Sequence, residues 1–280
     1  MKVAEKVAQY RTRATMMEPA DEQQLSRSQR RARSLASMGV FALLDTNDWL
    51  IGRFVHDAPS IWDPADWPWI KDVEARTPAI RAELEAYAAA AALPLVAEVS
   101  GFDPDSEGSR ESVPVGRGAW RTVILFANGK WIDATARHFP VTRACFADLH
   151  PKANVGFSAL DPNSHIEAHV GPNRGALRFQ LPIIVPGRPG DCRIRIGDEM
   201  VHWREGEAIV FDLKTNHEAW NESDQLRVLL MVEILQPLPR PLSWVNRLAQ
   251  YSYRWHPSYR QMPQRITRFG RRHDEAASTA

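Results

Sequence analysis

The chain has 280 residues, of which 44% are hydrophobic and 25% charged, so it can bury a core and is not disordered throughout. Its formal net charge of +1 at pH 7 excludes a global attraction to nucleic acid or membranes and leaves local patches open. Its two cysteines, Cys145 and Cys192, are too few for a disulfide scaffold and favour a reducing compartment.

Targeting signals are weak. No apolar run approaches the roughly 20 residues of a membrane helix. The N-terminal stretch "MKVAEKVAQYRTRATMMEPA" lacks the apolar core of a secretory signal, and its two glutamates make it a poor transit peptide. We therefore expect a cytoplasmic protein without a membrane span.

The first third of the chain reads as helical. Residues 1–45 are expected to form a basic helical arm, because "DEQQLSRSQRRARSLASMGV" has an acidic start and a glycine near its end. Residues 46–119 are expected to pack on the core as a helical and Trp-rich segment. In it, Ile80, Leu84 and Tyr87 have helical spacing, whereas "SIWDPADWPWI" combines helix-breaking prolines with three tryptophans that favour burial.

Residues 120–237 change to short runs of β type, separated by turn residues. The runs are "RTVILFA", "ANVGFSAL", "ALRFQLPIIV", "CRIRIGD", "EAIVFDL" and "RVLLMVEI". No helical segment between them is long enough for a parallel crossover, which predicts an antiparallel sandwich or jelly roll, cupin-like barrels included. The predicted fold is mainly β with flanking helices around a double-stranded β-helix core.

Residues 238–280 return to helix with "LSWVNRLAQYSYRW" and continue as a basic, aromatic tail. Trp, Tyr and Arg alternate there, and no acidic residue follows Pro237 until Asp274. This composition suits packing on the barrel, and it equally suits docking to an anionic partner. Nucleic acid is not an expected partner, and both of the other interpretations stay open.

One strand raises a chemical question. In "HVGPNRGALRFQLPI", Leu177, Phe179 and Leu181 alternate with Arg178 and Gln180. Alternate side chains of a strand point to opposite faces. The polar face must therefore either meet water or line a pocket that needs a cation.

Histidine is the commonest ligand for transition metals, and the chain has nine. Two sets of ligands compete. His165 and Glu167 with His217 supply two imidazoles and a carboxylate, whereas His169 with His217 supplies only two ligands. Since His165, Glu167 and His169 could share one face of a strand, their spacing does not choose between the sets. Five of the other histidines are expected to be surface or structural: His56, His138, His202, His256 and His273. His150 precedes a proline in an expected turn.

Three segments, 131–146, 157–186 and 192–234, resemble the aspartyl/asparaginyl β-hydroxylase family of 2-oxoglutarate-dependent iron oxygenases. The resemblance covers roughly residues 120–237 and is gap-free from Ser158 to Pro182. It implies a jelly roll that uses Fe(II), 2-oxoglutarate and O2 to hydroxylate an unactivated carbon, with succinate and CO2 as co-products.

The resemblance implies the metal ligands. The iron-binding histidines of the family match His169 in "HVGP" and His217 in "NHEAW". No carboxylate completes the set, because Gly171 stands where an ordinary oxygenase has Asp or Glu. We expect weaker iron binding than at a three-ligand site, and we expect Asp at position 171 to restore the third ligand.

The resemblance also implies the cosubstrate site. The arginine that pairs with the distal carboxylate of 2-oxoglutarate matches Arg227, assisted by Ser158, and Arg178 matches the arginine near the metal-bound carboxylate. Gln180 departs from the family, which often has histidine there; its amide can still donate a hydrogen bond. Independently of the family, a buried Arg227 predicts an anionic ligand or an internal acid such as Glu233 or Asp212.

The substrate is less determined. We expect an amino-acid-like compound, free, peptidyl or carrier-bound. Glu167 and His165 are the candidate substrate contacts, although Glu167 departs from the aromatic residue of one family member and equally suits a solvated rim. Alternatives are a hydroxylase of a lipid or other small metabolite, a halogenase with chloride at the open iron position, and a non-catalytic cupin-like module that binds an anion.

Overall fold

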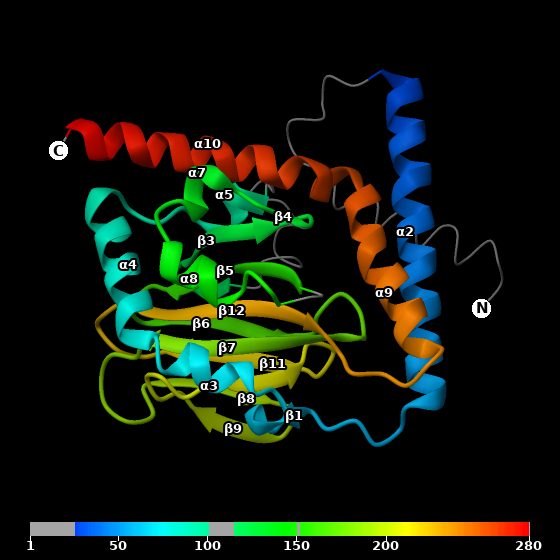
Figure 1. Ribbon diagram of the computed structural model, residues 1–280, viewed down its shortest axis with the longest axis horizontal. Coiled ribbons are helices and arrows are strands. Elements are labelled where there is room, and N and C mark those ends of the chain that lie inside the picture. Colours follow the sequence, from blue (N-terminus) through cyan, green and yellow to red (C-terminus); the bar gives the residue numbers. More distant parts are fainter. Residues whose placement is uncertain (1–25, 101–114, 150–151, 280) are drawn as a thin grey trace.

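The computed structural model describes residues 26–100, 115–149 and 152–279. Most of the expected N-terminal arm (residues 1–25), residues 101–114 and His150 lie outside the described residues. Two antiparallel sheets face each other, and helices surround them on several sides (Figure 1).

The strands of the two sheets alternate along the chain. From β5 to β8 and again from β10 to β12, each successive strand lies in the opposite sheet, and all pairings are antiparallel. This confirms the predicted mainly β, double-stranded β-helix fold. In spatial order the larger sheet contains β1 (Ile61–Trp62), β10 (Ile209–Asp212), β7 (Ala176–Ile184), β12 (Arg227–Leu235), β5 (Lys152–Leu160), β3 (Trp120–Ala127) and β4 (Lys130–Trp131). The smaller sheet contains β2 (Val115–Arg117), β6 (Ser164–His169), β11 (His217–Asn221), β8 (Cys192–Ile196) and β9 (Glu199–His202).

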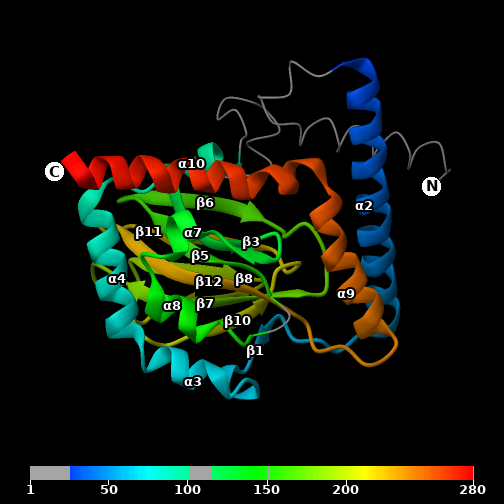
Figure 2. The same ribbon diagram turned by 45° about the horizontal axis from the view of Figure 1, so that its top comes forward.

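The helices form two groups. Those between the first and the fifth strands are η2 (Pro64–Asp66), α3 (Trp69–Glu74), α4 (Thr77–Ala90), α5 (Val96–Ser100), α7 (Asp133–Ala136) and α8 (Pro140–Cys145). At the chain ends, α2 (Arg27–Phe54) runs antiparallel beside α9 (Leu242–Ser252), and η3 (Tyr253–Trp255) leads into α10 (Pro257–Thr279), as both views show (Figures 1 and 2).

Two of these helices differ from the expected segments. Helix α2 continues through residue 45, where the arm was expected to end. The expected tail is also helical over most of its length, as α10. Ile266 of α10 is 2% exposed and packs in a cluster with Val99, Ala127 and Ile132, so tertiary contacts hold this helix in place.

The larger sheet is apolar on its outer face and partly polar on its inner face. Leu177, Phe179 and Leu181 of β7 belong to the main core, which includes buried residues of α3 and α4. Arg178 and Gln180 therefore point the other way, toward the space between the sheets. The helices occupy the apolar face of β7, so its polar face lines the interior of the barrel.

Candidate functional site

The predicted histidine pair is assembled by two neighbouring strands. His169 at the end of β6 lies directly opposite His217 at the start of β11. Their ring centroids are 4.1 Å apart, and His217 is 6% exposed. The pair is therefore a preformed feature of the smaller sheet.

A β-bulge decides which face of β6 carries His169. His169 pairs with His217, but Ile166 pairs with Ala219, so two residues of β6 lie opposite the single residue between His217 and Ala219. The extra residue breaks the alternation of side chains. His169 consequently shares a face with buried Ile166, and the expected common face of His165, Glu167 and His169 does not form.

The other two members of that expected face lie elsewhere. The Nε2 atom of His165 is 2.8 Å from Oε1 of Glu218, and its ring stacks on Trp220 at 5.1 Å. The carboxylate of Glu167 lies against Gly116 of β2. Neither side chain joins the histidine pair.

Backbone carbonyls fix the tautomer of both histidines. Nδ1 of His169 is 2.7 Å from the carbonyl oxygen of Glu167, and Nδ1 of His217 is 2.8 Å from that of Thr215. A carbonyl only accepts, so Nδ1 carries the proton of each neutral ring and the Nε2 lone pair is available to a metal. The sequence did not reveal these two orienting contacts.

Both imidazoles are held neutral. Burial, followed by the charge of His169, lowers the pKa of His217 to about 3. Burial also lowers the pKa of His169, and the nearby Arg178 guanidinium adds to the effect in both rings. Neutral imidazole is the form that binds metals, so the charge state of the pair suits a cation.

The position of the usual third ligand is closed by the backbone. The amide of Gly171 donates to the carbonyl oxygen of Leu213 at 2.6 Å, and a Cβ atom on Gly171 would lie only 2.7 Å from that oxygen. An aspartate does not fit there without a shift of the chain, so we now expect that Asp at 171 does not restore a ligand. Within the ranges that the structure describes, no third His, Cys, Asp or Glu joins the pair.

Arg178 faces the pair from β7 of the larger sheet. Its Nη2 donates to Oε1 of Glu233 at 2.6 Å, and Glu233 also accepts from Nδ2 of Asn154 at 2.6 Å. The sulfur of Met231 lies 3.5 Å from Nη1 of Arg178 and 3.8 Å from Nε2 of Gln180. The Oε1 atom of buried Gln180 has no partner among the described residues. Sequence reasoning missed Met231 and Asn154, which carry no motif.

Arg227 is the most unusual charge in the barrel. It is 1% exposed, its Nε and Nη2 atoms have no hydrogen-bond partner among the described residues, and its guanidinium lies over Trp203 at 4.5 Å from the ring centroid. Burial lowers its pKa to about 10. Neither acid considered from the sequence reaches it, since Glu233 bonds to other residues and Asp212 accepts from a backbone amide.

The described residues around Arg227 supply no counter-charge. Burial raises the pKa of the neighbouring Cys192 thiol to about 11, which keeps it neutral. Ser158, on the strand adjacent to β12, is 2% exposed, and its Oγ accepts from Nε1 of Trp120 at 2.9 Å. The hydroxyl proton of Ser158 remains for a ligand. A buried, unpaired guanidinium beside a hydroxyl fits a carboxylate.

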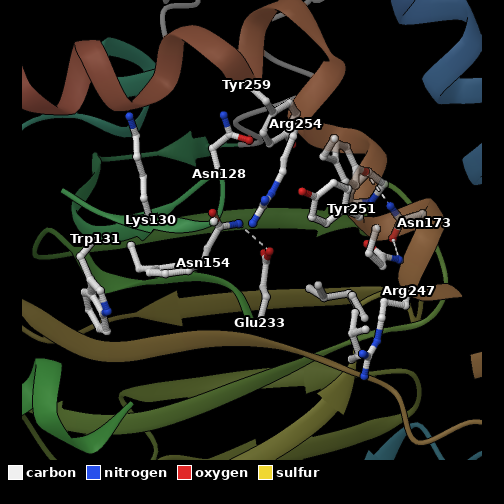
Figure 3. Close-up of a pocket in the computed structure, with 18 of the residues that line it drawn as sticks. Asn128, Lys130, Trp131, Asn154, Asn173, Glu233, Arg247, Tyr251, Arg254 and Tyr259 are labelled. Atoms are coloured by element: carbon white, nitrogen blue, oxygen red, sulfur yellow. Dashed lines mark hydrogen bonds between the residues drawn. The ribbon is translucent and has the colours of Figure 1, made fainter. Parts of the chain in front are cut away.

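A pocket of about 610 Å³ adjoins this region (Figure 3). Glu233 lies at its inner wall, with Pro172 and Leu213 beside the Gly171 turn, and α9, η3 and α10 close its opposite side. Glu233 connects this pocket to the histidine pair only indirectly, because it bonds Arg178, which lies near both histidines. Neither histidine nor Arg178 is among the residues that line the pocket.

A second histidine group has a different role. Ligand atoms of His138, His273 and Asp274 lie within 4.8 Å of one another. His138 is already bonded to Asp274 at 2.8 Å, whereas Nε2 of His273 bonds the carbonyl of Tyr87 at 2.7 Å and its ring stacks on Tyr87. These contacts tie α10 to α4 and to the segment between α7 and α8, which agrees with reading both histidines as structural.

Comparison with known proteins agrees with the geometry. The model of the family described as Aspartyl/Asparaginyl beta-hydroxylase matches residues 74–237. The ornithine lipid ester-linked acyl 2-hydroxylase of Rhizobium tropici is 35% identical over 188 residues, which cover 67% of this chain and 64% of that protein. The aspartyl/asparaginyl beta-hydroxylase of Mus musculus is 26% identical over 141 residues, covering 49% of this chain and 18% of that protein. The chain thus matches less than two thirds of either relative.

Solved structures resemble the chain only distantly. A predicted oxalate decarboxylase from Thermotoga maritima has a TM-score of 0.30 and 14% identity, covering 43% of this chain and 84% of that one. A Cupin 2 conserved barrel domain protein from Salinispora arenicola has a TM-score of 0.28 and 11% identity, covering 46% and 83%. At these scores neither structure informs the site.

Proposed function

The chain belongs to the aspartyl/asparaginyl β-hydroxylase family, and we propose that it is an Fe(II)- and 2-oxoglutarate-dependent dioxygenase that hydroxylates an unactivated carbon. The observation that carries the proposal is the neutral histidine pair on the inner face of one sheet, combined with a buried arginine that lacks a counter-charge in the same barrel. A metal and a dianion would complete these two groups.

His169 and His217 would hold the iron through Nε2. Imidazole suits Fe(II), and the carbonyl acceptors on Nδ1 hold both rings in the orientation that leaves Nε2 free. With only two protein ligands, more coordination positions remain for cosubstrate and oxygen than at a three-ligand site. Bound iron, 2-oxoglutarate and O2 would supply the oxidation of a C–H bond, with succinate and CO2 as co-products.

Arg227 would hold the distal carboxylate of 2-oxoglutarate, assisted by the hydroxyl of Ser158. A guanidinium offers two parallel donors to a carboxylate, and pairing removes the penalty of burying the cation alone. Arg178 would lie near the metal-bound end, oriented by Glu233, and the amide of Gln180 would contribute a neutral hydrogen bond. The aromatic and aliphatic side chains between the sheets exclude water from this space.

For the substrate we keep the expectation of an amino-acid-like compound, whose carboxylate would meet the cations of Lys130, Arg247 and Arg254 in the pocket. A lipid is the second candidate, favoured by the name of the Rhizobium tropici relative. Glu167, against β2, is proposed as a rim contact to the substrate. His165, already bonded to Glu218, is the weaker of the two.

The test is metal content together with succinate formation. Anaerobically loaded protein should bind about one iron(II) per chain, and His169→Ala and His217→Ala should each abolish binding. His165→Ala is the matched control, because it removes a histidine from the same strand and should leave iron in place. Normal iron binding in both alanine variants, with the fold intact by circular dichroism, would refute the assignment.

The same assay separates the alternatives. A dioxygenase converts 2-oxoglutarate to succinate, whereas an anion-binding module does not. A halogenase would give a chlorinated product in chloride buffer, and a hydroxylase gives a product heavier by one oxygen atom. Comparison of metabolites and lipids from cells with and without the gene would then identify the substrate.

A further inference from the structure

Exposed large hydrophobic side chains are concentrated on one side of the molecule. Of the nine in the described part of the chain, seven belong to α2, α9 or η3, which pack beside one another (Figure 1). Four of these follow a single stripe along α9 and η3: Trp244, Leu248, Tyr251 and Trp255, which are 60%, 52%, 48% and 53% exposed. Scattered single residues would need no explanation, but a continuous stripe does.

The stripe reverses the usual arrangement of a surface helix. Residues at positions i, i+4 and i+7 lie on one face of a helix, so Trp244, Leu248 and Tyr251 project together. The side of α9 that is buried carries Asn246, Ala249 and Ser252 instead. Among the described residues nothing covers this stripe, and a helix that buries amide and hydroxyl groups while exposing tryptophan suits an apolar or interfacial partner.

The charge beside the stripe has one sign. The guanidinium of Arg240 lies 5.2 Å from the ring centroid of Trp244, and that of Arg254 lies 4.1 Å from the ring of Tyr251. From Leu238 to His273 the sequence has eight arginines and no Asp or Glu. The partner should therefore be anionic.

The end of α2 extends the same side of the molecule. Its C-terminal end lies beside the N-terminal end of α9 in both views (Figures 1 and 2). Trp49 and Phe54 near that end are 64% and 60% exposed, and the guanidinium of Arg53 lies 5.5 Å from the ring of Phe54. The combination of exposed aromatic ring and arginine is thus repeated on a second helix.

We propose that the docking face, defined as Trp244, Leu248, Tyr251 and Trp255 together with Arg240 and Arg254, binds the surface of an anionic phospholipid bilayer. Trp and Tyr favour the interface between headgroups and acyl chains, and Arg binds the anionic headgroups. None of the described helices is long and apolar enough to cross a bilayer.

The docking face is continuous with the substrate pocket. Tyr251 and Arg254 belong to both, and Arg247 lines the pocket from the same helix (Figure 3). A molecule leaving the bilayer at this face would therefore enter the pocket lined by Glu233, the ion-pair partner of Arg178. Resting on the proposed hydroxylase function, this continuity favours the second of the two substrate candidates, a membrane lipid.

The experiment measures sedimentation of the full-length, metal-free protein with phospholipid vesicles. The protein should bind vesicles of phosphatidylcholine and phosphatidylglycerol, bind phosphatidylcholine alone far more weakly, and dissociate as salt is raised. The double variant Trp244→Ser/Leu248→Ser should lower the partition coefficient about tenfold or more, and Arg240→Gln about fivefold. None of these three residues lines the pocket.

Matched controls lie on the other side of the barrel. Met200→Ser removes a side chain that is 46% exposed on β9, and Arg204→Gln removes one that is 74% exposed; both variants should bind vesicles normally. Thermal melting of every variant checks the fold. Unchanged vesicle binding by the folded double variant, or no binding of the wild type to anionic vesicles, would overturn the proposal.

Two other results are separable from this one. If light scattering showed a dimer that the double variant abolishes, a second copy of the chain would cover the face and the bilayer proposal would fail. Vesicle binding needs neither iron nor 2-oxoglutarate, and the iron assay needs no vesicles. Failure of the docking face therefore leaves the hydroxylase proposal standing, and failure of the iron assay leaves the docking face standing.

Discussion

Replacing Arg227 by methionine should make the ligand-free protein more stable and remove its affinity for 2-oxoglutarate. Arg227 is 1% exposed, and two of its guanidinium nitrogens lack a partner among the described residues. A cation in that state opposes folding until an anion arrives. Methionine has a similar length and leaves an apolar side chain among Trp203 and its neighbours.

The magnitude follows from the pKa of Arg227, which burial lowers from 12.5 to about 10. Because the lowered pKa penalises the charged form in the folded state, and arginine is charged at pH 7 in both states, the full penalty of about 3 kcal/mol applies. The variant loses the cation–π contact with Trp203, which is worth about 1–2 kcal/mol. The net gain is about 1–2 kcal/mol, or a rise of a few degrees in Tm.

The assay is denaturant unfolding of metal-free wild type and Arg227→Met, followed by binding of 2-oxoglutarate to the metal-loaded forms. The variant should lose about 2–5 kcal/mol of binding, roughly thirtyfold to several thousandfold in Kd. Arg178→Met is the control, because Arg178 already bonds Glu233 at 2.6 Å, so its loss should destabilise by about 1–3 kcal/mol. If Arg227→Met instead destabilised the metal-free protein by more than about 1 kcal/mol, a counter-charge would already be present and the reasoning would be refuted.

Three further changes probe other parts of the site. Gly171→Ala should lower the free energy of unfolding by about 1–3 kcal/mol, because its Cβ atom would lie 2.7 Å from a backbone oxygen. The control Gly39→Ala on α2, with nothing within 4 Å of the new Cβ atom, should be neutral or stabilising. Gly171→Asp should not increase the affinity for iron. Because burial raises the pKa of Cys192 from 9.0 to about 11, its contribution to stability is complete below pH 9 and is lost between pH 9 and 11, by at most about 1.4 kcal/mol per pH unit. Cys192→Ala should remove that part of the alkaline slope in urea titrations, and an unchanged slope would contradict the burial argument. Glu167→Gln should retain iron and succinate formation while impairing hydroxylation; loss of iron in this variant would identify Glu167 as a ligand after all.

The sequence patterns predicted most strands of the larger sheet but not β6 and β11, the strands that carry His169 and His217. The six predicted runs correspond to β3, β5, β7, β8, β10 and β12, where β-branched and aromatic residues alternate or fill the strand. β6 and β11 read "SHIEAH" and "HEAWN", which are too polar to signal a strand. They are strands because their neighbours in the smaller sheet pair with them on both sides, and no local pattern contains that information.

The candidate residues of the site could be named from the sequence, but the directions in which their side chains point could not. The family resemblance pointed to His169 and His217, which spacing alone did not single out, but the bulge that turns His169 inward depends on pairing with β11. The closed position at Gly171 depends on Leu213, more than forty residues away in the sequence. Both features are long-range backbone contacts, and alternation along a single strand cannot report them.

The two faces of the larger sheet differ in how much they stabilise the fold, and this difference explains how the barrel tolerates buried polar groups in its interior. Among the described residues, the cluster on the outer face contains 25 buried side chains, against 11 in the cluster between the sheets. Since hydrophobic stabilisation scales with the apolar area removed from water, most of it arises where β7, β5 and β12 meet α3 and α4. The inner face can therefore carry Arg178, Gln180 and Arg227 without losing the fold. Their unsatisfied donors and acceptors lower the stability of the ligand-free protein, but the same groups can bind an anionic ligand. The increase in unfolding free energy predicted for Arg227→Met should therefore be accompanied by a loss of affinity for 2-oxoglutarate.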